Sequence, residues 1–518
     1  MAKASKNRAS KFKYVSPGQL TLAGFDTPFS QNLDVTNRWV ILAEKIPWDH
    51  ITNIYSKQLN NKSKGANGIN PRVVIGSLII KHMCNFSDRE TVNAIQENIY
   101  MQYFIGYSSF SNETPFDPSL FVDIRKRLGV AQINEINEKI LQLNGLLPGV
   151  VEAPADKNED EENKPEENAE TLTEEELSTD QPPPKERVIA HEGELIVDAT
   201  ACPQDISYPT DLNLLNDARE KSEELIDFLC GLKKVTKPRT YRENARKEYL
   251  KVAQKKHKTK KEIRAGIKKQ LSCLHRNVKN IYVLLQLFEK IPFKKKQYKY
   301  FLVIQTLYDQ QSEMHKNRVH SIDDRIVSIH QPHVRPIVRG KQNAKVEFGA
   351  KIDITITNGF AFLEESSWDA YNEGTTLMAT VERYRKRTGC YPKKIFADKI
   401  YCNRANRKEL KELKIELVAK PLGRPSKAME PNHIRPGDRN PVEGKFGQAK
   451  TRYGLNKVKA RLSDTSLSWI ATIIMVLNLV KLTGRVLYCM LRNEKIKLKA
   501  AIKYMIYILY YEINFWVT

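Results

Sequence analysis

The chain has 518 residues and is strongly basic, with 84 Lys and Arg against 61 Asp and Glu, a net charge of +23 at pH 7 and a sequence pI of about 9.4. A chain of this length is expected to hold two or three domains, and its charge is typical of proteins that bind a polyanion. The seven cysteines form no C-x2-C pair and there is no GxxxxGK[ST] loop, so the sequence indicates neither a disulfide framework nor a nucleotide-driven enzyme.

The N-terminal part of the chain is predicted to be a flexible arm followed by helices. Residues 1–33 are interpreted as the basic arm, and residues 34–150 as a helical domain. Within it, residues 72–83 show an amphipathic helical pattern, and Ser87-Asp-Arg-Glu90 is a capping box that opens the next helix. Several short helices in a basic protein favour a module of the helix-turn-helix kind that binds DNA ends. An ordinary helical dimerisation or scaffold domain fits the same pattern.

An acidic segment follows. Residues 151–187 contain 14 Asp and Glu against 4 Lys and Arg, a local charge of −10 that leaves +33 for the rest of the chain. Few large apolar residues occur in it, so a disordered linker is predicted. The linker serves either as a solubilising spacer or as a shield for a basic surface.

Two aspartates each follow a short apolar run that favours a β-strand. Asp198 follows Glu194-Leu-Ile-Val, and Asp398 follows Lys394-Ile-Phe-Ala, with a helical pattern over 404–414 after the second. An isolated aspartate is most often a turn or helix-cap residue. A carboxylate at the carboxyl end of a strand in an α/β sheet, however, points into the crevice where ligands bind.

The elements around these aspartates predict a mixed sheet flanked by helices over residues 188–485. Asn358-Gly359 is a hairpin signal that joins strands predicted at 345–357 and 360–366. A helix over 375–387 and a strand over 415–419 complete the pattern. A mostly helical insertion is predicted at about 200–343, a buried helix in the apolar run 467–480, and a packing helix in the tail, residues 486–518.

Part of the insertion is unusually basic, since residues 233–279 hold 18 Lys and Arg against 3 Glu. A run of this kind is usually a solvated helix face. In so basic a protein, Lys255, Lys256, Lys260 and Lys261 are also candidates for contacts with DNA phosphates, which would make binding strongly salt-dependent.

The segment from Arg439 to Lys450 follows the pattern R-x3-E-x6-K. At about 100° per residue on a helix, Arg439, Glu443 and Lys450 fall within about 40° of one another. A solvated face with an i,i+4 Arg–Glu pair is the simpler interpretation. If Glu443 joins Asp198 and Asp398, three carboxylates can hold two Mg²⁺ ions, the arrangement that serves phosphodiester chemistry.

These residues resemble a known family. Asp198, Asp398 and Glu443 resemble the D-D-E triad of bacterial insertion-sequence transposases with a ribonuclease-H-like catalytic domain, and the segment from Arg439 to Lys450 resembles their Y-x2-R-x3-E-x6-K signature. Pro436 stands where that signature has its tyrosine, so the role of the tyrosine is unassigned. The resemblance covers nearly the whole chain apart from the acidic segment and the extreme C-terminus. It includes residues 37–40, 46–49, 116–118, 198–211, 325–339 and 346–351.

The resemblance implies an α/β fold, namely a ribonuclease-H-like mixed sheet flanked by helices, with a helical N-terminal domain and a large helical insertion after the first strand. It implies that Asp198, Asp398 and Glu443 bind Mg²⁺, with Mn²⁺ as a substitute, and that Arg439 and Lys450 contact DNA. The expected partners are the terminal inverted repeats of the element and a target double-stranded DNA, bound by a homodimer in the bacterial cytoplasm near the nucleoid, with no membrane and no nucleotide cofactor.

Two other functions stay open at this point. One is a non-catalytic DNA-binding protein derived from a transposase, for which the loss of the signature tyrosine at Pro436 is the support. The other is a related metal-dependent nuclease without strand transfer.

Overall fold

The computed structural model describes residues 33–58, 68–147, 190–338, 346–420 and 437–487, together with Cys489. Several predicted features lie outside these ranges. They are the basic arm up to residue 32, the acidic linker 151–187, Pro436 and nearly all of the tail beyond Leu487.

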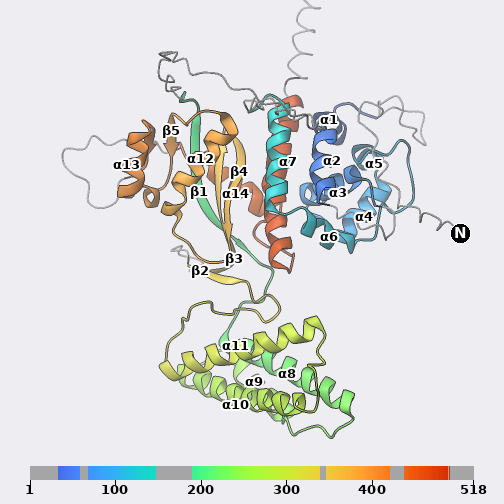
Figure 1. Cartoon of the computed structure of the whole chain (residues 1–518), viewed down its shortest axis with the longest axis vertical. Coiled ribbons are helices and arrows are strands. Elements are labelled where there is room, and N and C mark those ends of the chain that lie inside the picture. The colour runs from blue at the N-terminus through green and yellow to red at the C-terminus, as the bar shows by residue number, and fades with distance from the viewer. Residues whose placement is uncertain are drawn as a thin grey trace, which may run out of the picture.

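The N-terminal helices form the body on the right of Figure 1. Ser87 and Glu90 cap each other's backbone N–H groups at 3.2 and 2.7 Å, which confirms the capping box. The helices are α1 (Arg38–Lys45), α2 (Trp48–Lys57), α3 (Pro71–Cys84), α4 (Asp88–Glu97), α5 (Ile99–Phe104), α6 (Leu120–Arg127) and α7 (Val130–Leu143).

The prediction that residues 72–83 form an amphipathic helix is wrong, because α3 is buried on all sides from Pro71 to Met83. Its polar residues are accommodated rather than exposed. The Arg72 guanidinium lies over the Trp48 ring at 4.7 Å and donates to the Phe104 carbonyl at 3.1 Å. The Lys81 ammonium lies 2.9 Å from Asp88. Buried cations of this kind need such partners.

A six-stranded mixed sheet lies beside these helices. Its strands run in the order β2-β3-β1-β5-β6, and β4 also pairs with β3. β1, β5 and β6 are parallel, whereas β3 is antiparallel to β1, β2 and β4. Asn358 (φ 52°) and Gly359 (φ 77°) make the predicted left-handed hairpin turn. The strands are β1 (Glu194–Pro203), β2 (Arg335–Val338), β3 (Val346–Thr357), β4 (Phe360–Ser367), β5 (Lys394–Phe396) and β6 (Glu416–Val418).

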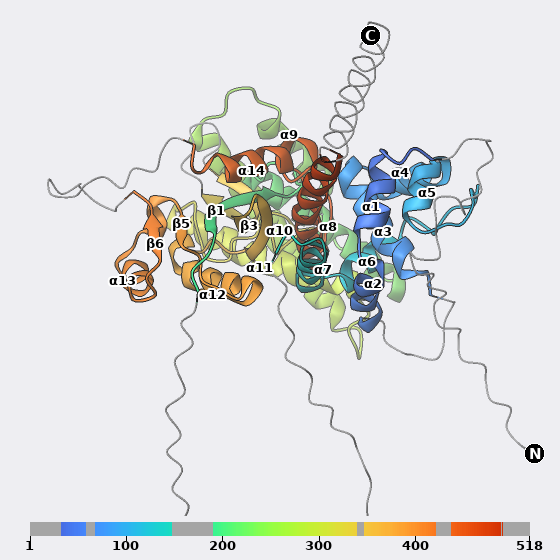
Figure 2. The same ribbon diagram turned by 90° about the horizontal axis from the view of Figure 1, so that it is seen from above.

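Helices cover both faces of the sheet, with α12 (Leu377–Thr388) and α14 (Asn440–Arg452) on opposite sides in Figure 2. The side chains of β1 alternate between these faces. Leu195 and Val197 pack in the core that contains α12, and Ile196 belongs to the core that contains Val442 of α14. Asp198 therefore faces the α14 side. The helix α13 (Arg404–Glu412) precedes β6.

The helix Ser463–Leu487 runs beside α7, between the sheet and the other N-terminal helices, in both views. It is long and apolar enough to cross a membrane, but 61% of its most apolar stretch is buried inside the protein. Asn478 donates to Asn137 of α7 at 3.0 Å and to the Ala361 carbonyl of β4 at 2.7 Å. The prediction of a buried helix over 467–480 is confirmed.

The insertion between β1 and β2 is a separate helical bundle below the sheet in Figure 1. It has an apolar core of its own, which includes Leu215, Ile226, Leu274 and Ile304. Its helices are α8 (Asp211–Lys233), α9 (Arg242–Ala253), α10 (Lys260–Leu285) and α11 (Lys295–Asn317).

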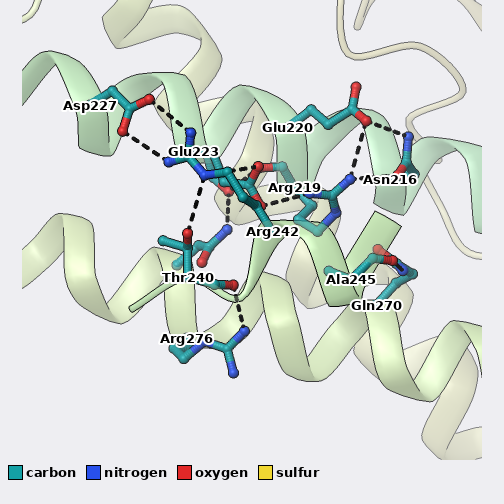
Figure 3. A network of polar contacts seen from close by, with 12 residues as sticks. Asn216, Arg219, Glu220, Glu223, Asp227, Thr240, Arg242, Ala245, Gln270 and Arg276 are labelled. Carbon is teal, nitrogen blue, oxygen red and sulfur yellow. Dashed lines mark hydrogen bonds and ion pairs between the residues drawn. The ribbon is translucent and has the colours of Figure 1, made fainter. Parts of the chain in front are cut away.

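Three arginines of this bundle form polar contacts with other residues of the bundle, as Figure 3 shows. Arg219 is buried and contacts Glu223 at 2.6 Å and Asn216 at 2.8 Å. Arg242 donates to both oxygens of Asp227 at 2.9 and 3.0 Å, and Arg276 donates to the carbonyl of Thr240 at 2.9 Å. The contacts of Arg242 and Arg276 fasten the connection between α8 and α9, whereas those of Arg219 lie within α8, so the three arginines have structural partners within the protein.

Candidate active site

Two aspartates meet where the β1–β5 ladder ends. The parallel pairing sets Leu195 beside Ile395 and Ile196 beside Phe396. Extending this register by two residues places Asp198 opposite Asp398. Because neighbouring strands are about 4.8 Å apart, the two carboxylates project from adjacent positions just past the last ladder pair.

The prediction that Asp198 ends its strand is wrong, although Asp398 does follow the end of β5, one residue after Ala397. β1 continues for five residues beyond Asp198, to Pro203. That extension pairs with Gly349 through Asp353 of the antiparallel strand β3. At the level of Asp198, therefore, β1 has lost its pairing with β5 but keeps its pairing with β3.

Arg439 bridges the two aspartates. Its Nη2 lies 2.8 Å from Oδ2 of Asp198, and its Nη1 lies 3.7 Å from Oδ1 of Asp398. Arg439 is the N-cap residue of α14, and Val442, one turn later, is fully buried and anchors the helix against the sheet. One guanidinium thus spans a pair of carboxylates contributed by two strands.

The two carboxylates differ in environment. The Asp198 side chain is 17% exposed and the Asp398 side chain is 51% exposed. Burial raises the pKa of Asp198, and nearby Glu373 adds to this, while Arg439 and the Ala199 N–H act in the opposite direction. Asp398 accepts a hydrogen bond from the Lys399 N–H at 2.7 Å.

Glu443 lies on α14 one turn after Arg439 and is exposed, and Lys450 lies half-buried near the far end of that helix. No ion pair joins Arg439 to Glu443 in the part of the chain that the structure describes, so the interpretation as an i,i+4 pair is wrong: the guanidinium turns to the aspartates instead. Among the described residues, no three His, Cys, Asp or Glu side chains are close enough together to hold an ion. The structure therefore brings two of the three predicted carboxylates together.

The aspartate pair fits a hard divalent cation in its chemistry. Mg²⁺ and Mn²⁺ prefer carboxylate oxygens, and Asp198 and Asp398 already flank one positive group, the guanidinium of Arg439. A cation held between them would find two anionic oxygen donors on adjacent strands.

Sequence reasoning missed two acidic residues near this site. Asp353 of β3 is fully buried and accepts hydrogen bonds at 2.6 Å from Tyr371 and at 2.6 Å from Thr376. Burial raises its pKa to about 6. Glu373 pairs with Lys351 at 2.8 Å. The alternation in Lys351-Ile-Asp-Ile-Thr-Ile-Thr357 marks Asp353 as part of a polar face, but that face is covered by the segment leading into α12 rather than by solvent.

The four lysines singled out in the insertion gather around the start of α10. Lys255 and Lys256 lie in the connection between α9 and α10, not on a helix as the sequence pattern suggested, and Lys260 and Lys261 occupy the first turn. All four are exposed. Lys255 forms an ion pair with Glu262. Cations are unfavourable at a helix N-terminus, so this placement favours an anionic partner.

Comparisons with known proteins give two family models, one over the N-terminal helices and one over the segment that carries most of the candidate site. A family model described as "Transposase domain (DUF772)" matches residues 28–127, which include α1 to α6. A second, described as "Transposase DDE domain", matches residues 395–480 and so includes Asp398, Arg439, Glu443 and Lys450.

An "Uncharacterized protein ORF8 in nfe locus" of Rhizobium meliloti is 33% identical over 97 residues, which are 19% of this chain and 46% of that protein. The chain thus spans less than half the length of this relative. No solved structure matches the chain. Two transposase family models match separate segments of one polypeptide, and together they support a similarity of this chain to the DDE transposases of insertion sequences.

Proposed function

We propose that the protein cleaves the ends of its insertion sequence and joins the freed 3′-hydroxyls to target DNA. The observation that carries this proposal is the placement of Asp198 level with Asp398, with the N-terminus of the Glu443 helix tied to both through Arg439. A structural ion pair needs only one carboxylate. Two carboxylates at one level of a parallel pair, beside a helix that carries a third, suit a cation-dependent phosphodiester site.

We also propose that the sheet is ribonuclease-H-like and that the domains follow the predicted layout. Support comes from the parallel set β1, β5 and β6, the antiparallel β3 and the β3–β4 hairpin. The helical bundle inserted between β1 and β2 and the helical N-terminal body fit the same layout.

The reaction has two steps that need no external energy source. In the first, water adds to the phosphorus at the element's end, the P–O3′ bond breaks, and the 3′-oxygen leaves with a proton. In the second, that 3′-hydroxyl adds to a target phosphodiester and the target's own 3′-oxygen leaves. One phosphodiester is made for each one broken in the second step.

Asp198 and Asp398 would hold Mg²⁺, or Mn²⁺ in its place, and Glu443 would complete the set. When bound, such ions would lower the pKa of the attacking water or hydroxyl and would stabilise negative charge on the leaving oxygen. Arg439 and Lys450 then contact phosphates of the scissile strand by charge-assisted hydrogen bonds. The aspartates would orient the reacting phosphate only indirectly, through the metal ions that they hold.

The DNA path in this proposal also includes the bundle. Lys256, Lys260 and Lys261 are exposed at the start of α10, where the helix dipole adds to their attraction for phosphate. The active unit on paired element ends is a homodimer, and it acts in the cytoplasm at the nucleoid.

The test uses the full chain and labelled duplexes taken from the DNA that flanks the gene. With Mg²⁺, the proposal expects a nick that leaves a 3′-hydroxyl and then a joined product with a target plasmid. Asp398→Asn serves as the inactive control. Cleavage without joining would indicate a nuclease, and binding without cleavage would indicate a non-catalytic DNA-binding protein. Either result contradicts the proposal.

A further inference from the structure

We propose that Arg439 is the positioning residue that holds Asp198 and Asp398 in the free protein, and that its release links cation binding by the aspartates to phosphate binding by the same guanidinium. This inference rests on the proposed function, since it assumes that the aspartates take a cation and that DNA passes α14. It assigns Arg439 two partners that exclude each other, one inside the protein and one on the DNA.

The geometry shows which partner Arg439 has when no DNA is present. Its guanidinium lies 2.8 Å from Asp198 and 3.7 Å from Asp398, and the Arg439 side chain is only 20% exposed. A cation at the N-terminus of a helix is disfavoured by the helix dipole, and Arg439 occupies that place on α14. Its position is therefore set by the aspartates and not by the helix.

The charges explain why the aspartates need this partner. Asp198 is mostly buried, and Glu373 contributes a further negative charge nearby. A partly buried carboxylate that loses its counter-charge is left with an uncompensated desolvation cost. Arg439 supplies the counter-charge in the free protein, and a divalent cation would supply it when bound.

The two ligands are coupled through this one side chain. A guanidinium that is paired with the aspartates cannot also make a bidentate contact to a phosphate. A cation on the aspartates removes the reason for that pairing and frees Arg439 for DNA. By linkage, DNA that captures Arg439 must favour cation binding by the same factor.

The first test requires no metal. Duplex binding is measured in EDTA by fluorescence anisotropy with a random-sequence 30-base-pair duplex for four proteins: wild type, Asp198→Asn, Arg439→Gln and the double variant. Asp198→Asn releases Arg439, so it should tighten duplex binding by about fivefold or more. In the Arg439→Gln background the same change should alter affinity less than about twofold. Equal tightening in both backgrounds would be a general effect of net charge and would overturn the inference.

The second test measures the affinity of the protein for Mn²⁺ by electron paramagnetic resonance, without DNA. Arg439→Gln should tighten Mn²⁺ binding about fivefold, because the competing cation is gone. Arg452→Gln is the matched control, since it removes the same charge from an exposed position on α14 and should leave the Mn²⁺ affinity unchanged. If Arg439→Gln unfolds in a thermal melt, Arg439→Gly and Arg439→Lys replace it, and only the first should tighten Mn²⁺ binding.

The outcomes separate this inference from the proposed function. A wild-type protein that binds neither duplex nor Mn²⁺ contradicts both. A wild-type protein that binds both ligands and cleaves DNA, while Arg439→Gln changes neither the Mn²⁺ affinity nor the response to Asp198→Asn, overturns the role of Arg439 alone.

Discussion

Arg387 of α12 lies 2.8 Å from Glu138 of α7, and this ion pair is one of the contacts that join the mixed sheet to the N-terminal helices. The same guanidinium contacts Glu364 of β4 at 3.0 Å and stacks on the Phe362 ring at 4.0 Å. Because the N-terminal body and the sheet also share one apolar core, the two are packed as a unit. A DNA segment held by the N-terminal helices would therefore meet the aspartates at a fixed distance.

Replacing Arg387 should destabilise the protein strongly. Arg387→Met leaves the buried Glu364 carboxylate with only the more distant guanidinium of Arg383, 3.9 Å away, and such a loss costs up to about 3–5 kcal/mol of unfolding free energy. Arg385→Met removes an exposed cation from the same helix and should cost less than about 1 kcal/mol. Guanidinium denaturation of both variants measures the difference. Similar destabilisation of the two variants would show that the Arg387 contacts are no stronger than a surface ion pair.

The proposed catalytic roles predict a separation of cleavage from folding. Asp398→Asn and Glu443→Gln should each abolish cleavage of the flanking-DNA duplex, because each removes a charge that the cations need. Both should keep the wild-type thermal midpoint, since Asp398 is half exposed and Glu443 is exposed. Glu412→Gln on α13 is the control that retains cleavage. A Glu443→Gln variant with wild-type cleavage rates would remove Glu443 from the proposed site.

Local signals in the sequence predicted much of this structure. The Asn358-Gly359 hairpin, the Ser87 capping box, the strand before Asp398 and the buried helix over 467–480 each depend on a few neighbouring residues. Such signals are present in the sequence itself, because the turn geometry, the cap and the apolar run are local properties.

Features set by distant pairing were not predictable in this way. The second half of β1, Ala199-Thr-Ala-Cys202, has small residues that form a strand because β3 pairs with them from about 150 positions away. The burial of Asp353 depends likewise on Tyr371 and Thr376 closing over it. The ion pairs of Arg439 could not be read from the R-x3-E-x6-K spacing, because that spacing gives its helical neighbours and not its partners on the sheet.

The lysines at the start of α10 predict a change in salt dependence. Because Lys255 already pairs with Glu262, the better test set is Lys256, Lys258, Lys260 and Lys261, all changed to Gln. Affinity for random-sequence duplex should fall, and the slope of log K against log salt should become shallower by about 0.9 for each phosphate that the variant no longer neutralises. Preference for the element's end should survive, since phosphate contacts position the DNA and base contacts specify it.

The matched control removes four charges from exposed lysines of the bundle that lie outside the first turn of any helix, at Lys233, Lys234, Lys279 and Lys290. This control should leave the salt slope closer to that of the wild type. Equal slopes for the two quadruple variants would show that the start of α10 has no particular role, and an unchanged slope in both would place the DNA path elsewhere.

The buried carboxyl of Asp353 predicts a pH dependence of stability. Its folded-state pKa, raised by burial to about 6, lies above the ordinary value of 3.8, although hydrogen bonds from Thr376 and Tyr371 oppose the shift. The folded protein therefore binds this proton more tightly than the unfolded chain. The stability that this bound proton contributes is fully present below pH 3.8. It is lost as the pH rises through about 6 and is absent at higher pH.

The substitution Asp353→Asn removes the titratable carboxyl group but keeps an oxygen that can accept the hydrogen bond from Tyr371. As the pH rises from 4 to 7, the unfolding free energy of the variant should increase relative to that of the wild type by up to about 3 kcal/mol. Thermal and denaturant unfolding of both proteins across that range measures the difference. Asp369→Asn, an exposed carboxylate with 74% of its side chain accessible, should show a small and nearly constant difference. If the difference for Asp353→Asn is also independent of pH, Asp353 is ionised in the folded protein and its charge is balanced there. Lys351 would then be the group that balances it.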